Sequence, residues 1–105
     1  MDPATVQSLS QVLEIVGRVV LDVRGEEEAL RIGNTVDGSV KLEYKHDDDM
    51  FIQEVGSLLP SDKNTPIICH WNKGGRAGKA ALALQKVGYL NVYNGVNGEH
   101  IKSAL

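Results

Sequence analysis

The sequence predicts an α/β domain in which a parallel sheet carries helices on both faces. Strand-type and helix-type patterns alternate along all 105 residues, with no repeat or low-complexity tract between them. Two runs, Val19–Val23 and Pro66–Trp71, are rich in apolar residues and show little alternation, which is typical of central strands covered on both sides. Because strands and helices alternate over so short a chain, we expect parallel strands joined by helical crossovers within one domain spanning 1–105.

Composition narrows the class of protein. Apolar residues make up 42% and charged residues 24% of the chain, the balance of an ordinary soluble globular domain. No apolar run approaches the ~20 residues that a membrane-spanning helix needs. The first residues also lack the basic start and apolar stretch of a secretory signal. We therefore expect a soluble protein with no membrane partner.

Charge and cysteine content limit the kinds of partner and metal site that this chain can have. The net charge is −3 and no stripe of lysine or arginine occurs, so a nucleic-acid partner is not expected. Cys69 is the single cysteine, which excludes an internal disulfide and a zinc site of several thiolates and fits a reducing intracellular compartment. His46 next to Asp47–Asp49 indicates a mobile acidic loop rather than a metal site. No metal or cofactor is expected.

The first elements follow from caps and apolar spacing. Ser8 and Gln11 form a capping box ahead of an apolar stripe, which predicts a helix over Leu9–Val16 that ends at Gly17. Val19–Val23 then predicts a buried strand. Asp22 inside that strand needs a hydrogen-bonding partner, and the neighbouring Arg24 can supply it.

The middle of the chain predicts a short helix, an edge strand and a second helix. Glu26–Ile32 is the short helix, closed by Gly33, and Ser39–Tyr44 alternates with period two as a strand near a sheet edge does. Asp48 or Asp49 can cap the next helix. Its buried side would carry three apolar residues, Phe51, Val55 and Leu58.

The last third contains the second buried strand and the longest helix. Pro66–Trp71 is followed by a polar loop over Asn72–Gly75 and a helix from about Arg76 to Val87. Gly88 would end that helix, and Asn91–Tyr93 predicts a last short strand. In the strand Pro66–Trp71, alternation places His70 on the opposite side from its neighbour, as a core or rim histidine with satisfied hydrogen bonds.

The loop from Trp71 to Arg76 is the best functional candidate. It leaves a central strand at the carboxyl end, where open α/β sheets bind ligands. Gly74 and Gly75 allow backbone N–H groups to point together at an anion, next to the positive end of the following helix. Arg76 and Lys73 add cationic side chains. The sequence therefore predicts an anion-binding loop, with a plain strand-to-helix turn as the alternative.

Two familiar phosphate-binding motifs do not fit this loop. A nucleotide-binding loop would need four residues between its glycines, but Gly74 and Gly78 lie closer, and Ala80 replaces the hydroxyl that would hold magnesium. A cysteine phosphatase places five residues between nucleophile and arginine, whereas six separate Cys69 from Arg76.

A third pattern is specific to a family. The order and spacing of several short motifs resemble the rhodanese family over roughly Leu9 to Gly98. The buried strand, active-site loop and helix of that family resemble Thr65–His70 followed by Gly74–Ala80. The other matching pieces are "LDVR" at Leu21–Arg24, the acidic helix start at Glu27–Glu28, the "G-[AS]-[IV]" segment at Gly38–Val40 and the "GY-x-NV" segment at Gly88–Val92.

The resemblance implies a parallel five-stranded sheet flanked by helices on both faces and a sulfur-carrying cysteine at the mouth of the loop, in the pattern C-x-x-G-x-R. Alignment on Gly74 and Arg76 puts Trp71 at the cysteine position, and counting from Thr65 gives the same result. Indole cannot carry a persulfide. On this register the chain is a binding or regulatory module with an anion-binding loop and lost or weak sulfurtransferase activity. Its partner would be a small thiosulfate-like anion or a protein.

The alternative is an active thiosulfate or persulfide sulfurtransferase that uses Cys69 as sulfur carrier, with Lys73 and Arg76 holding the anionic donor. Cys69 should share the side of Trp71 but lie ~6.5 Å deeper in the strand, where a thiol is usually inert. Trp71 would either fill the substrate space or form a platform for a ligand. After Gly98 the aromatic residue common in the family is missing, which indicates a trimmed chain or a weakened final helix.

Overall fold

The computed structural model describes residues 3–72 and 75–105 as five helices and four strands. In chain order they are α1 (Val6–Leu13), β1 (Val19–Asp22), α2 (Glu26–Ile32), β2 (Val40–Lys41), α3 (Asp48–Val55), β3 (Ile67–His70), α4 (Gly75–Lys86), β4 (Val92–Asn94) and α5 (Gly98–Lys102). Among the described residues, no helix is long and apolar enough to cross a membrane.

The sheet is parallel throughout, in the order β2-β1-β3-β4. Over the described residues it has four strands instead of the expected five. Beyond β4 the N-terminal segment makes one isolated parallel bridge, between Pro3 and Asn94, and the Ala4 N–H donates to the Asn94 carbonyl at 2.8 Å. Proline has no N–H to give to a ladder, and among the described residues this segment pairs at one point only.

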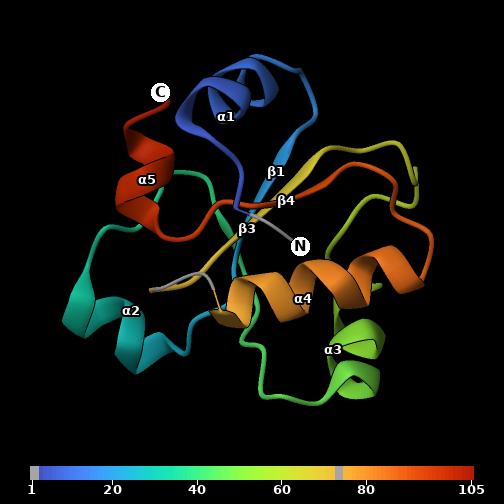
Figure 1. The fold of residues 1–105 in the computed structure, drawn as a ribbon. Coiled ribbons are helices and arrows are strands. Elements are labelled where there is room, and N and C mark those ends of the chain that lie inside the picture. Colours follow the sequence, from blue (N-terminus) through green and yellow to red (C-terminus); the bar gives the residue numbers. More distant parts are fainter. Residues whose placement is uncertain (1–2, 73–74) are drawn as a thin grey trace.

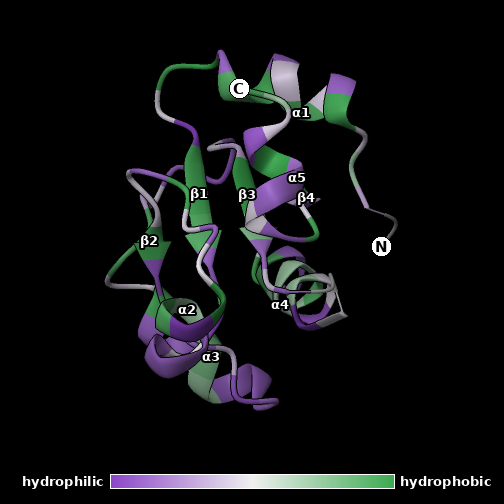
Figure 2. Ribbon diagram, turned by 90° about the vertical axis from the view of Figure 1, so that its left-hand side faces the viewer, coloured by the Kyte–Doolittle hydropathy of each residue, from purple (hydrophilic) through white to green (hydrophobic). Residues whose placement is uncertain are grey.

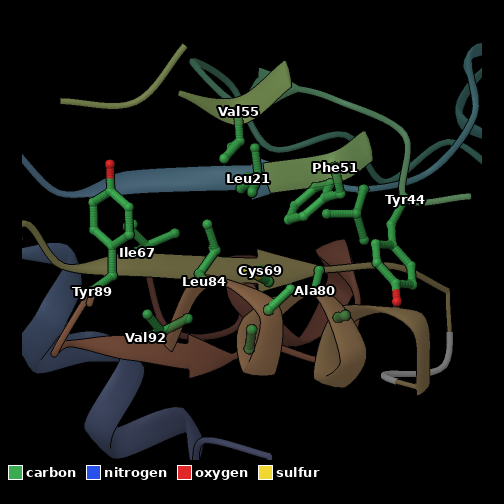
Figure 3. Close-up of a cluster of buried hydrophobic side chains, with 14 of the residues drawn as sticks. Leu21, Tyr44, Phe51, Val55, Ile67, Cys69, Ala80, Leu84, Tyr89 and Val92 are labelled. Carbon is green, nitrogen blue, oxygen red and sulfur yellow. The ribbon is translucent and has the colours of Figure 1, made fainter. Parts of the chain in front are cut away.

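Each face of the sheet is covered by two helices, as predicted. Side chains alternate along a strand, so Val20 and Ile68 pack on the side of α1 and α5. Leu21 and Cys69, one residue further along, pack on the side of α3 and α4. Figure 1 shows these helix pairs on opposite sides of the strands. The larger of the two cores lies beneath α3 and α4 and is drawn in Figure 3.

The hydropathy of the ribbon agrees with this layering. The central strands β1 and β3 are mostly apolar along their length, whereas polar residues dominate the visible surfaces of α2 and α3 (Figure 2). Near-continuous apolar character is what a strand buried on both faces requires. The prediction of two central strands is therefore confirmed.

The start of the chain differs from the prediction. Helix α1 spans Val6–Leu13 instead of Leu9–Val16 because Thr5 is its N-cap: its Oγ1 accepts the Ser8 N–H at 3.1 Å. The predicted cap, Ser8, lies inside the helix, where its hydroxyl donates to the Thr5 carbonyl. Thr5 and Ser8 are both good caps, and the earlier one holds the helix end.

Other boundaries are close to expectation, with four differences. Helix α3 is capped by Asp47 instead of Asp48 or Asp49, since Asp47 accepts the Met50 N–H at 3.1 Å. Helix α2 matches its predicted range, but β2 covers only Val40–Lys41 of Ser39–Tyr44. Leu58, predicted on the buried side of a helix, lies beyond the end of α3 and is 46% exposed. The final helix α5 does form, and Asn97 caps it by accepting the His100 N–H at 2.8 Å.

Candidate functional site

The candidate site lies at the carboxyl edge of the sheet, where three connections meet. Helix α2 follows β1, the Trp71–Asn72 segment follows β3, and Asn94–Gly98 follows β4. All strands run in the same direction, so all three connections leave the sheet at this edge. Lys73 and Gly74, two of the predicted site residues, lie outside the described residues. Gly75, predicted in the loop, is the first residue of α4.

A single carboxylate on α2 joins two of these connections, the one after β1 and the one after β3. Oε2 of Glu28 accepts Trp71 Nε1–H at 3.0 Å and Asn72 Nδ2–H at 3.2 Å. Its Oε1 accepts Arg76 Nη1–H at 2.9 Å and the Gly25 backbone N–H at 3.1 Å. The carboxylate thus receives four hydrogen bonds, one of which caps its own helix. It connects α2 to both sides of the loop.

Arg76 is held in place from two directions. Its guanidinium forms an ion pair with Glu28, and both side chains are partly exposed, at 17% and 24%. The same guanidinium lies over the indole ring of Trp71, with Cζ 4.3 Å from the ring centroid. A cation stacked on an indole is stabilised by the negative face of the ring. The cation predicted to bind an external anion is therefore already paired with an internal one.

The contacts around Glu28 also decide its ionisation. Burial alone would raise the pKa of Glu28, but the hydrogen bonds from Gly25 and Trp71 and the charge of Arg76 hold that pKa below its usual value. Each of these donors stabilises the ionised form. Glu28 is therefore a carboxylate at neutral pH and keeps its pairing with Arg76.

Trp71 is fixed by its backbone as well as by its ring. Its N–H donates to the Val96 carbonyl at 2.8 Å. Val96 adopts φ +68°, a conformation rare for a β-branched residue, and its own N–H donates to Asn94 Oδ1 at 3.0 Å. The ring packs against the core beneath α3 and α4. Trp71 thus fills the space between that core and the Arg76 guanidinium.

Cys69 lies on the same side of β3 as Trp71, as alternation predicted, but inside the core. It is fully buried, and Figure 3 shows it between the sheet and α4, near Ala80 and Leu84. Burial raises the pKa of Cys69 to about 12. No charged group contributes to that shift, because the thiol is surrounded by apolar side chains.

The opposite side of β3 carries a buried polar group. His70 lies beside Asp22 in the parallel pairing of β3 and β1, and both are buried. Asp22 accepts two hydrogen bonds from the Arg24 side chain, each at 2.9 Å, which confirms the predicted partner. Burial alone would raise the pKa of Asp22, but these hydrogen bonds, a third from the Arg24 backbone N–H and the Arg24 charge keep it below its usual value.

His70 itself differs from the prediction of a satisfied histidine. Neither Nδ1 nor Nε2 has a hydrogen-bond partner among the described residues. Burial lowers the pKa of His70 to about 4; the Asp22 carboxylate acts in the opposite direction and the Arg24 charge in the same one. The imidazole is therefore neutral at physiological pH, with a buried donor and a buried acceptor that the described residues leave unpaired.

Two further buried atoms near the loop have no partner within 3–72 and 75–105. They are Nε of Arg76 and Oδ1 of Asn72, one a donor and the other an acceptor. A buried polar atom without a partner costs about 1–3 kcal/mol. Within the described part of the chain, the ends of the loop are therefore held through Glu28 while these two groups have no partner.

The acidic segment after β2 forms a separate feature. His46 and Asp47–Asp49 line an open groove of about 650 Å³ together with Lys79 and Lys86 of α4. Lys86 pairs with Asp48 at 3.3 Å, and Asp48 also accepts a hydrogen bond from the Tyr44 hydroxyl. The described residues contain no cluster of three or more His, Cys, Asp or Glu side chains placed to hold a metal ion.

Sequence reasoning identified the loop but missed the residue that organises it. In the sequence, Glu28 is recognisable only as an acidic residue at a helix start, 43 positions before Trp71. A glutamate at the third position of a helix is a capping signal, and this role is present in the hydrogen bond to Gly25. Nothing in the local pattern could show that the same carboxylate reaches Arg76.

Comparison with known proteins identifies the fold family. The family model "rhodanese-like domain" matches residues 5–102. A human single-domain sulfurtransferase, TSTD1, has a similar structure, with a TM-score of 0.68, 19% sequence identity and coverage of 97% of this chain and 96% of that one. The rhodanese-like domain of an Anabaena sp. protein gives a TM-score of 0.63 at 18% identity, covering 93% of this chain and 70% of that chain. A search of curated protein sequences gave no match. The chain belongs to the rhodanese-like domain family.

Proposed function

We propose that this rhodanese-like domain has lost most or all sulfurtransferase activity and serves as a binding or regulatory module. Its ligand at the loop would be a small thiosulfate-like anion or a partner protein. The proposal takes Trp71 as the residue at the family's cysteine position, on the register set by Gly74 and Arg76. A fold by itself does not establish an activity, so the residues of the site carry the proposal.

The observation that carries the proposal is the burial of Cys69. A sulfur carrier must meet its donor and acceptor as an accessible thiolate. Cys69 is fully buried and its pKa is raised to about 12, so its thiol is protonated at pH 7. Both accessibility and ionisation therefore oppose catalysis by this residue.

The surroundings of Trp71 support its role as a plug rather than as a platform. Its ring packs on the core, Arg76 lies over it, and its Nε1–H is bonded to Glu28. A platform needs an open ring face on which a ligand can stack. Trp71 instead fills the position at the end of β3 from which a family cysteine would act.

The competing proposal is a working sulfurtransferase. It is considered because the fold is similar to that of a protein named as a sulfurtransferase. Cys69 would attack the sulfane sulfur of thiosulfate, forming the persulfide and releasing sulfite, and cyanide would then take the sulfur as thiocyanate. This sequence requires β3 to open far enough to expose the thiol. Lys73 and Arg76 would hold the anionic donor.

The test is thiocyanate formation from thiosulfate and cyanide by the wild-type protein and the C69S variant. We expect both to remain at the uncatalysed rate, with far-UV circular dichroism showing that both are folded. Turnover in the wild type that disappears in C69S would establish the competing proposal. A W71C variant places a thiol at the end of β3, and a gain of turnover there would support the register on which the proposal depends.

A further inference from the structure

We propose that Glu28 is an internal anion that occupies the anion site of the loop, so that an external oxyanion binds only by displacing this carboxylate from Arg76. This inference rests on the proposed function, because it concerns how the same loop would receive its ligand. It assigns Glu28 an autoinhibitory role that the anion-binding interpretation of the loop did not contain.

The donors around Glu28 are those that an oxyanion would use. Arg76 Nη1, Trp71 Nε1 and Asn72 Nδ2 all point at its two oxygens, at 2.9, 3.0 and 3.2 Å. Guanidinium, indole and amide N–H groups can also donate hydrogen bonds to sulfate or sulfonate oxygens. These three described side chains therefore already surround an anion, and it is supplied by α2.

A tethered carboxylate is a strong competitor. Glu28 is held near the loop by α2, so its effective concentration there exceeds that of a dissolved anion at millimolar concentration. An external ligand is bound only by the fraction of molecules in which Glu28 has moved away, and its apparent affinity falls by that fraction. Removing the carboxylate should therefore strengthen anion binding at least tenfold.

Dissolved anions can reach the site, and two of its polar atoms have no hydrogen-bond partner among the described residues. Glu28 and Arg76 retain 24% and 17% exposure, so solvent anions have access to the pair. Nε of Arg76 and Oδ1 of Asn72 are buried without partners among the described residues. A ligand that brings more oxygens than one carboxylate, or a water with it, could satisfy the Arg76 donor that Glu28 leaves unpaired.

Trp71 provides the measurement, because it is the only tryptophan in the chain and its indole N–H bonds directly to Glu28. Its fluorescence is followed during a titration with sodium sulfate at constant ionic strength, with sodium chloride as the replaced salt. The variants are Glu28→Gln and, as a matched control, Glu27→Gln, which removes the same charge from an exposed neighbour on the same helix. Glu28→Gln keeps a side-chain oxygen that can cap Gly25.

We expect sulfate to reach half-saturation in E28Q at a concentration at least tenfold lower than in the wild type or in E27Q. The response should disappear in the double variant E28Q/R76M, because the cation is then missing. Equal titrations of wild type and E28Q, equal shifts in E28Q and E27Q, or no response in any variant would each overturn the proposal. If E28Q does not fold, E28D replaces it: its shorter carboxylate keeps the charge but reaches fewer donors, so the same direction of change is expected.

The two proposals can fail separately. Turnover of thiosulfate that depends on Cys69 would overturn the non-catalytic function while leaving the sulfate titrations to be judged on their own. Equal sulfate affinity in wild type and E28Q would overturn the occlusion by Glu28 and leave a protein without turnover as a rhodanese-like binding module.

Discussion

The backbone N–H of Trp71 donates to the carbonyl of Val96 at 2.8 Å, although Val96 has a left-handed backbone with φ +68°. This contact ties the end of β3 to the segment between β4 and α5. A left-handed conformation costs a residue with a Cβ about 1–2 kcal/mol, and branching at Cβ adds to that cost. The strained residue therefore supports the position of Trp71 in the candidate site.

Replacing Val96 with glycine should relieve this strain. We expect V96G to have a free energy of unfolding about 1 kcal/mol above that of V96A, since both lose the same methyl groups but only glycine is free of the left-handed penalty. Urea denaturation of the two variants gives the comparison. A V96A protein as stable as V96G would show that the Val96 backbone is not strained in solution.

The buried imidazole of His70 should make stability depend on pH. Its pKa is about 4 in the folded protein and near 6.5 when exposed, so the unfolded chain binds the extra proton as the pH falls below about 6.5. The His70 contribution to the free energy of unfolding is therefore fully present above about pH 6.5 and is lost toward pH 4, by up to about 3 kcal/mol. Urea denaturation at a series of pH values measures the decline.

The matched variants for this prediction are H70L and H46N. H70L removes the buried titratable group, whose two nitrogens have no partner among the described residues. H46N removes an exposed histidine with a left-handed backbone, a conformation that asparagine tolerates. Stability of H70L should change much less between pH 6.5 and 4, whereas H46N should follow the wild type. The same slope in H70L would rule out His70 as its source.

Gly98 should not tolerate a side chain. A Cβ added there would fall on the backbone carbonyl oxygen of Asn34, which cannot move away as a flexible side chain would. We expect G98A to lose about 3 kcal/mol or more of stability in thermal or urea unfolding. Gly56→Ala is the control, because a Cβ there meets its nearest atoms at an ordinary 3.7 Å. Equal losses in both variants would contradict the close approach of Gly98 to Asn34.

Cys69 should react with a thiol reagent only when the protein unfolds. The thiol is fully buried and its pKa is raised to about 12, so the native state offers neither access nor thiolate. Labelling with an aromatic disulfide reagent at pH 7.5 should be at least about 100-fold slower in buffer than in 6 M urea. The W71C variant carries an additional thiol that should label in buffer. Fast native labelling of the wild type would favour the sulfurtransferase alternative.

Local patterns in the sequence determined much of the fold. The range of α2 is as predicted because caps and apolar spacing within one helix decide its ends. The two apolar runs became the central strands β1 and β3 because only burial on both faces stabilises such segments. Alternation along β3 was enough to place Cys69 with Trp71 and to place His70 on the other side.

Competition between local signals was harder to judge. Thr5 and Ser8 are both good caps, and the start of α1 depends on which hydroxyl meets a free N–H group in the folded chain. The strand Ser39–Tyr44 shortened to Val40–Lys41, since pairing with β1 limits how far an edge strand extends. The five strands that the resemblance implied had only four located counterparts in the sequence, and beside β4 the described residues make one isolated bridge at Pro3, which has no N–H for a ladder.

The tertiary structure alone decided how the site is held together. Glu28 and Arg76 are 48 residues apart and meet because parallel strands bring their carboxyl ends to one edge of the sheet. The sequence shows which side chains can carry charge, but a charge has its partner only after the chain has folded. The sequence therefore indicated an anion-binding loop, whereas only the folded protein shows that Arg76 of this loop is already paired with the Glu28 carboxylate.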